Sequence, residues 1–189
     1  VKATSGSPAK VVGKMSGMNL TNIAYDVDGR YFIGVANRYD SSDGNTRCVE
    51  INLYDNSNPL SPRVVGSYTL GSRGSFCPAV SSSAATRTEI SLSADKTKFS
   101  VPLVLTDENG CISFSGAYVF RCLGGRLRLA GTMSNAIALE GGENAYLTLI
   151  HDRYVRACFF EGNRVVGVSR YFMISADMSD LSDCNTSIL

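Results

Sequence analysis

Short phrases recur along this chain at intervals of several dozen residues. Residues 7–14 (SPAKVVGK) return as residues 61–68 (SPRVVGSY) and, less closely, as residues 126–132 (RLRLAGT). A second phrase, at residues 28–35 (DGRYFIGV), recurs at residues 161–168 (EGNRVVGV). Such recurrence is typical of chains that use one supersecondary unit several times. The phrases therefore predict a repeat architecture before any local feature is considered.

Composition and charge narrow the class of protein. With 189 residues, 44% hydrophobic and 19% charged, the chain is long and apolar enough for a folded domain with a core. A net charge of +1, without a basic cluster, argues against nucleic acid or an anionic membrane as partner. No run approaches the ~20 apolar residues of a membrane span. The chain begins at Val1, and we expect it to be a piece of a longer polypeptide.

Local signals are those of strands and turns. Short runs rich in Val, Ile, Tyr, Phe and Thr end at Gly, Asn, Asp, Ser or Pro, which indicates an all-β chain. An opening strand runs from Lys10 to Met15, and the remaining strands form three groups. We predict them at residues 22–26, 31–37, 48–54 and 63–70; at 88–92, 98–105, 114–122 and 126–133; and at 153–160, 164–169 and 171–177.

Groups of four antiparallel strands are typical of β-propeller blades. We predict one partial propeller domain over residues 1–189, with blades at about 22–70, 86–133 and 145–183. The last blade lacks a fourth strand in this prediction. The strand from Lys10 to Met15 is predicted to be the outer strand of a preceding or partner blade.

Four glycines fall inside predicted strands, where glycine normally weakens a sheet. They are Gly34, Gly66, Gly131 and Gly167. Their recurrence at similar places predicts close approach between sheets.

An ordered series of phrases resembles a known family. Those phrases are residues 11–13, 32–34, 51–66, 71–75, 100–103, 115–120, 153–157 and 175–182. In this order the chain resembles the C-terminal part of a family of secreted bacterial and archaeal β-propeller proteins, distantly related to WD-type propellers. The resemblance covers about residues 10–183. It implies a propeller architecture, an extracellular or cell-surface location and a binding or scaffolding role. The family has no assigned catalytic residues.

Three blades are too few to close a ring of ~4–8 blades. One hypothesis is a homo-oligomer, in which the strand from Lys10 to Met15 of one copy adds to the residue 153–177 group of the next. Two copies would then close a six-bladed ring by strand addition. The alternative is that the chain is a fragment of a longer propeller.

Few residues suggest chemistry. His151 is the only histidine and is expected in a surface loop. Asp26, Asp28, Asp40 and Asp43 are candidate calcium ligands because calcium prefers oxygen donors. The alternative interpretation is a hairpin turn at the first two and a polar loop at the others. No catalytic or cofactor-binding residue is predicted.

Arginines and cysteines give weaker hints. Arg30, Arg38, Arg47 and Arg73 are expected near turns, where they could line one rim. The six cysteines show no CxxC pair or zinc spacing, and Cys122 and Cys158 are predicted to be buried thiols. The leading hypothesis is a non-enzymatic interaction scaffold. The alternatives are a hydrolase or lyase with its site in a propeller channel, and a calcium-stabilised adhesive module.

Overall fold

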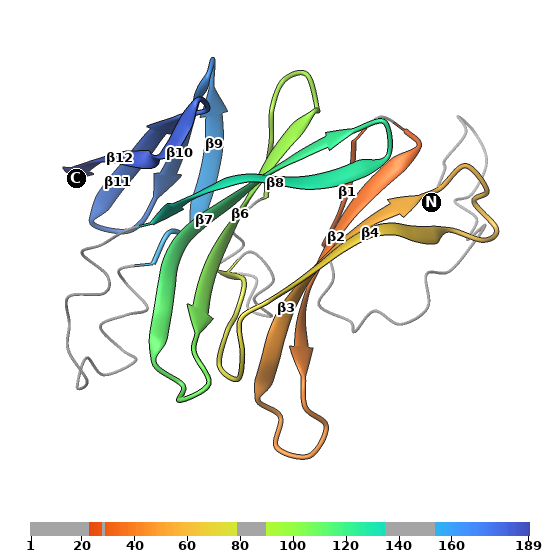
Figure 1. Cartoon of the computed structure of the whole chain (residues 1–189), viewed down its shortest axis with the longest axis horizontal. Coiled ribbons are helices and arrows are strands. Elements are labelled where there is room, and N and C mark those ends of the chain that lie inside the picture. Colours follow the sequence, from red (N-terminus) through yellow and green to blue (C-terminus); the bar gives the residue numbers. More distant parts are fainter. Residues whose placement is uncertain (1–22, 28, 79–89, 135–153) are drawn as a thin grey trace, which may run out of the picture.

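The computed structural model of the chain describes residues 23–27, 29–78, 90–134 and 154–189. Every regular element among these residues is a β-strand. The strands form three four-stranded antiparallel sheets, and each sheet is built from four consecutive strands (Figure 1). The prediction of an all-β chain with four-stranded units is therefore confirmed.

The strand bounds are as follows. Sheet 1 contains β1 (Ile23–Asp26), β2 (Tyr31–Tyr39), β3 (Thr46–Asp55) and β4 (Arg63–Leu70). Sheet 2 contains β5 (Ser91–Leu92), β6 (Lys98–Thr106), β7 (Ile112–Leu123) and β8 (Arg126–Ser134). Sheet 3 contains β9 (Ala157–Glu161), β10 (Arg164–Val168), β11 (Phe172–Asp177) and β12 (Asp180–Ile188).

The prediction that the third group lacks a fourth strand was wrong. β12 pairs with β11, with Ile174 opposite Thr186 and Ser175 opposite Asn185. The strand is mostly polar and exposed, and Leu181 is its one buried side chain. An edge strand held mainly by backbone hydrogen bonds needs no apolar alternation, so no alternation of apolar residues marks this strand in the sequence.

The presence of β12 also removes the basis of the expected strand addition. β12 fills the edge of β11 at which the strand from Lys10 to Met15 of a second copy was expected to pair. The vacancy that motivated this homo-oligomer does not exist. Lys10 and Met15 themselves lie outside the described residues.

Two apolar cores lie between the three sheets. The first core joins sheet 1, through side chains such as Ile33 and Ile51, to Phe99 and Phe120 of sheet 2. The rings of Phe99 and Phe120 stack with centroids 5.1 Å apart. The second core joins Val119 and Met133 of sheet 2 to sheet 3, where its side chains include Val165 and Ile174.

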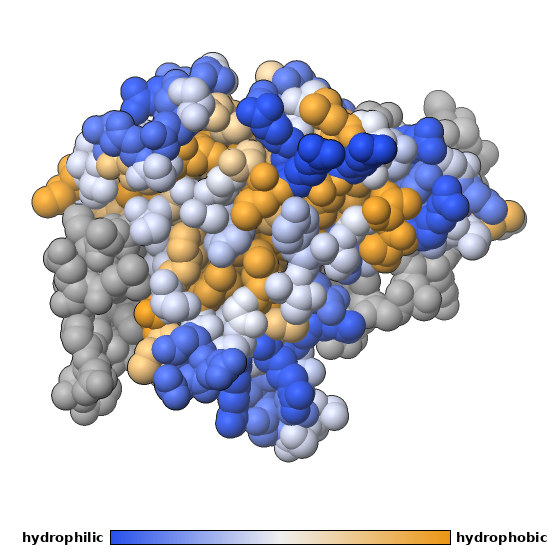
Figure 2. Space-filling view, in the orientation of Figure 1, coloured by the Kyte–Doolittle hydropathy of each residue, from blue (hydrophilic) through white to orange (hydrophobic). Residues whose placement is uncertain are grey.

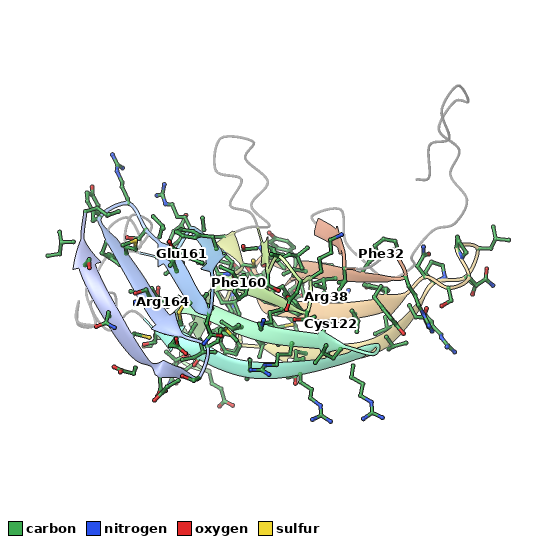
Figure 3. The ribbon with its side chains drawn as sticks, turned by 90° about the horizontal axis from the view of Figure 1, so that it is seen from above. Phe32, Arg38, Cys122, Phe160, Glu161 and Arg164 are labelled. Atoms are coloured by element: carbon green, nitrogen blue, oxygen red, sulfur yellow. The ribbon has the colours of Figure 1, made fainter. Side chains whose placement is uncertain are left out.

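Sheet 2 is thus covered on both faces. In β6 every residue from Phe99 to Thr106 is buried, whereas exposed and half-buried residues alternate along most of β4. Seen from above in Figure 3, the three sheets lie side by side along an arc in chain order. Phe32 lies towards the sheet 1 end of this arc, and Phe160, Glu161 and Arg164 lie at the sheet 3 end.

Glycines at two of the predicted positions allow neighbouring fourth strands to approach closely. A Cβ atom on Gly66 of β4 would lie 3.0 Å from the Cβ of Leu127 in β8. A Cβ atom on Gly131 of β8 would lie 2.8 Å from the Cδ1 of Leu181 in β12. Leu127 and Leu181 are each the second residue of their strand. The contact between a glycine of one fourth strand and a leucine of the next is therefore repeated: it joins sheet 1 to sheet 2 and sheet 2 to sheet 3.

The segment of residues 71–77 leads from sheet 1 to sheet 2 and is bonded to both. Phe76 and Val104 of β6 exchange two backbone hydrogen bonds of 2.8 and 3.0 Å. Buried Asn37 of β2 accepts a hydrogen bond from the Cys77 N–H at 2.8 Å and donates one to the Cys77 carbonyl at 3.4 Å. This connection is consequently held in one position relative to both sheets.

Candidate binding site

A polar pocket of about 480 Å³ opens where the β2–β3 hairpin meets the start of the connection to sheet 2. This end of the molecule is strongly hydrophilic in Figure 2. Seven residues line the pocket: Asp40, Asp43, Asn45, Arg47, Gly71, Ser72 and Arg73. They come from the β2–β3 loop, the start of β3 and the loop that follows β4.

The sequence of the β2–β3 loop determines its conformation. The Asp40 carboxylate accepts a hydrogen bond from the Ser42 N–H at 3.0 Å, and the Asp43 carboxylate accepts one from the Asn45 N–H at 2.8 Å. Gly44 has a φ of +69°, a left-handed conformation that glycine adopts without steric cost. Two successive Asx turns therefore fix both carboxylates at the loop surface.

The second loop is fixed by hydroxyl groups. The Ser75 hydroxyl accepts hydrogen bonds from the Ser72 N–H at 3.0 Å and from the Thr106 N–H at 2.9 Å. The Thr106 hydroxyl donates to the Arg73 carbonyl at 2.7 Å. In addition, the Gly74 N–H donates to the Thr46 carbonyl at 2.9 Å, which ties this loop to β3. The backbone that carries Arg73 is therefore held by sheet 1 and sheet 2 together.

Two ion pairs balance the charge of the pocket. Arg47 pairs with Asp40 through its guanidinium group, and Arg73 pairs with Asp43 at 2.8 Å. The arginine side chains remain 68% and 69% exposed, so each guanidinium keeps donors that face solvent. The pocket presents alternating positive and negative groups with no net charge.

Hydrogen bonds favour the ionised state of Asp40, Asp43 and Arg47. The hydrogen bond from the Ser42 N–H, followed by that from Arg47, lowers the pKa of Asp40 to about 2. The hydrogen bond from the Asn45 N–H is the main reason that the pKa of Asp43 is lowered, and the bond to Asp40 raises the pKa of Arg47. A carboxylate with such a low pKa is a weak general base near neutral pH.

The predicted calcium ligands do not form one group. Asp40 and Asp43 lie together in the pocket, but each is paired with an arginine that occupies the place of a cation. Asp26 is the last residue of β1, and Asp28 lies outside the described residues. Within the described ranges, no cluster of three or more His, Cys, Asp or Glu side chains is arranged to hold a metal ion.

The predicted arginine rim is formed only in part. Arg47 and Arg73 share the pocket, whereas Arg30 lies at the other end of sheet 1 and pairs with buried Asp55 at 3.2 Å. Arg38 pairs with Glu50 at 2.8 Å across the β2–β3 ladder.

The other predicted groups give no reactive centre. His151 lies outside the described residues. All six cysteines are described and none forms a disulfide, and Cys122 and Cys158 are buried, as predicted. Burial raises the pKa of the Cys158 thiol to about 12, so this thiol stays protonated and unreactive.

Comparison with known proteins supplies no assignment. The chain matches no family model and no curated protein. None of the described residues belongs to a helix long and apolar enough to cross a membrane.

Sequence reasoning named four of the pocket residues but did not bring them together. The sequence predicts Asp40 and Asp43 as candidate calcium ligands and Arg47 and Arg73 as rim residues, and all four line the pocket. A signal was present in the sequence, because each Asp is followed two residues later by Ser or Asn, a pattern typical of Asx turns. The approach of Arg73 to Asp43 depends on the path of the chain after β4, and no local pattern encodes it.

Proposed function

We propose that the chain is a non-enzymatic interaction scaffold of β-propeller type from an exported bacterial protein. In this proposal the three sheets are blades, and the polar pocket is the contact site for a partner. The resemblance of the sequence phrases supports the family and the export. The repeated contact of Gly66 on Leu127 and Gly131 on Leu181 supports blade-like stacking.

One observation carries the binding role. The pocket holds two carboxylates, Asp40 and Asp43, that are fixed by backbone hydrogen bonds and paired with arginines, and the pKa of each carboxyl is lowered. Preorganised donors and acceptors of this kind bind a ligand at low entropic cost. They do not supply a proton donor or acceptor that changes state near pH 7.

The alternating charges of the pocket suit a partner in which hydrogen-bond acceptors and donors also alternate. The exposed guanidinium edges of Arg47 and Arg73 would receive carboxylate or carbonyl oxygens, and the Asp40 and Asp43 oxygens would receive N–H donors. A peptide segment with both kinds of group fits this description. We therefore propose a polypeptide partner.

The test is selection of short random peptides displayed on phage against the intact chain, followed by affinity measurement of the enriched peptides. Arg73→Gln should weaken their binding about tenfold, which corresponds to about 1.4 kcal/mol. Arg63→Gln is the matched control. Arg63 is also an exposed arginine of sheet 1 paired with an aspartate, Asp55 at 3.5 Å, but it lies outside the pocket.

Equal weakening by both substitutions, or enrichment of no peptide that depends on Arg73, would contradict the binding role. An ester or glycoside hydrolysis activity that disappears in the Arg73→Gln variant would favour the enzymatic alternative instead.

A further inference from the structure

The β7–β8 hairpin carries arginines that differ from the other described arginines in their surroundings. Five arginines of sheet 1 and its exit each pair with a carboxylate: Arg30, Arg38, Arg47, Arg63 and Arg73. In sheet 3 and the segment before it, Arg164 donates to the Ser175 hydroxyl at 2.7 Å, and Arg156 and Arg170 lie over tyrosine rings. Each of these side chains has a structural contact.

Arg121, Arg126 and Arg128 are exposed and have no ion pair or side-chain hydrogen bond with any residue that the structure describes. Strand register gathers them on one face. Lys98 of β6 lies opposite Arg121 of β7, and Arg121 lies opposite Arg128 of β8. Arg126 is two residues from Arg128 and therefore shares its face. We name these four residues the basic row.

Folding alone does not account for the basic row. Like charges placed directly opposite each other on neighbouring strands destabilise a sheet. Lys98 is relieved by Asp95, whose carboxylate lies 3.3 Å from the ammonium group. The opposed pair of Arg121 and Arg128 has no such relief among the described residues. Figure 2 shows strongly hydrophilic atoms gathered over β8, with hydrophobic atoms beside them.

We propose that the basic row binds an acidic polysaccharide, a chain of uronate sugar rings. Three members of the row, Lys98, Arg121 and Arg128, stand on adjacent strands, so the Cα atoms that carry these cations follow one another at intervals of about 4.8 Å. Consecutive rings of a polysaccharide are spaced similarly and offer one carboxylate each. Arginine binds carboxylates through paired N–H donors. Leu123, two residues beyond Arg121 and 57% exposed, offers an apolar surface to the C–H face of a sugar ring.

Two other polyanions fit this surface less well. An extended acidic peptide places side chains of one face about 6.6 Å apart. That spacing matches the step from Arg126 to Arg128 along β8, but not the positions of Lys98, Arg121 and Arg128 across the three strands. Single-stranded nucleic acid is usually held by aromatic side chains that stack on its bases. The neighbours of Arg121 on its face of β7 are the aliphatic residues Val119 and Leu123. The net charge of +1 also lacks the strongly basic balance of most nucleic-acid-binding domains.

The experiment is calorimetric titration of the full chain with oligogalacturonate at several salt concentrations. Fully methyl-esterified oligogalacturonate serves as the neutral ligand of the same shape. The variant is Arg121→Gln with Arg128→Gln, and the control is Arg63→Gln with Arg164→Gln, which removes equal charge elsewhere. We expect the first pair to weaken binding at least about tenfold and to reduce the dependence on salt. The control should change affinity less than about twofold.

Retained folding of both double variants is checked by their thermal unfolding. If the control pair weakens binding equally, the affinity depends on the total charge of the protein and not on the basic row. That result would overturn the proposal. Binding of the esterified oligomer as strongly as the acid would also overturn it. Tighter binding of polyglutamate or of a single-stranded DNA oligonucleotide at equal charge would replace the proposed partner with one of those classes.

Discussion

At the scale of single residues, aspartate side chains determine the conformation of many of the turns. Seven aspartate carboxylates accept a hydrogen bond from the backbone N–H two residues later: Asp40, Asp43, Asp55, Asp95, Asp107, Asp177 and Asp180. Hydrogen bonds to the ionised form lower the pKa of Asp40, Asp43, Asp55, Asp95, Asp177 and Asp180, and the backbone bond is the largest cause at Asp40 and Asp43. Protonation of these six carboxyl groups should therefore weaken the turns that they form.

Asp40 provides a pH prediction. Its pKa is about 2 in the folded chain, below the value of about 3.9 expected in the unfolded chain. The stability it contributes is thus present above about pH 4 and is lost as the pH falls towards 2. Carboxyl NMR titration should give a midpoint near pH 2 at Asp40, and Asp40→Asn should reduce the acid dependence of loop hydrogen exchange.

Glu108→Gln is the control for this experiment, because Glu108 is an exposed carboxyl in another hairpin loop. A midpoint near 4 at Asp40, or an equal effect of both substitutions, would contradict the proposed Asx turn.

At the scale of elements, the fourth strands set the distance between sheets. Gly66 and Gly131 let β4 approach β8 and β8 approach β12, and in each case the contact is made with a leucine near the start of the next strand. The absence of a side chain is what allows this approach, since both glycines are partly buried in extended strands. The packing of neighbouring sheets therefore depends on the absence of a Cβ atom at Gly66 and Gly131.

Gly131→Val should destabilise the chain by about 1–3 kcal/mol, because the added atoms overpack the contact with Leu181. Ala130→Val is the control on the same strand, at an exposed position. Urea unfolding measures both free energies. The further substitution Leu181→Ala in the Gly131→Val background should recover part of the loss, and additive losses from the two changes would argue against the contact.

At the scale of the whole molecule, sheet 2 is the centre of the structure. It contributes side chains to both apolar cores, and β6 is buried along nearly its whole length. β4 and β12, in contrast, are edge strands with many exposed residues. Because sheets 1 and 3 each share one core with sheet 2, loss of sheet 2 would remove both cores.

Native-state hydrogen exchange should reflect this arrangement. The amides of β6 and β7 should exchange slowest, since their opening requires the largest loss of packing. Those of β12 should exchange fastest among the paired strands, because its side chains are mostly exposed. Equal protection of β12 and β7 would contradict a structure built around sheet 2.

Much of the strand pattern was predictable from sequence. β4 has the predicted bounds, and the glycine contacts of Gly66 and Gly131 follow from phrases that recur in the chain. β12 was missed because a polar edge strand shows no alternation of apolar residues. Its turn, however, repeats the bond pattern of the turn after β3: Asp177 bonds Ser179 as Asp55 bonds Ser57. That local repeat is the signal that would have revealed the strand.

The sequence by itself determined most of the strands, their turns and the repeat, because these depend on residues close together in the chain. Only the tertiary structure decided that Arg73 meets Asp43 in one pocket, and that Lys98, Arg121 and Arg128 stand in one row. Both features join residues from different strands or loops. Their positions depend on strand register and on the path of the connection at residues 71–77, which the packing of whole sheets fixes.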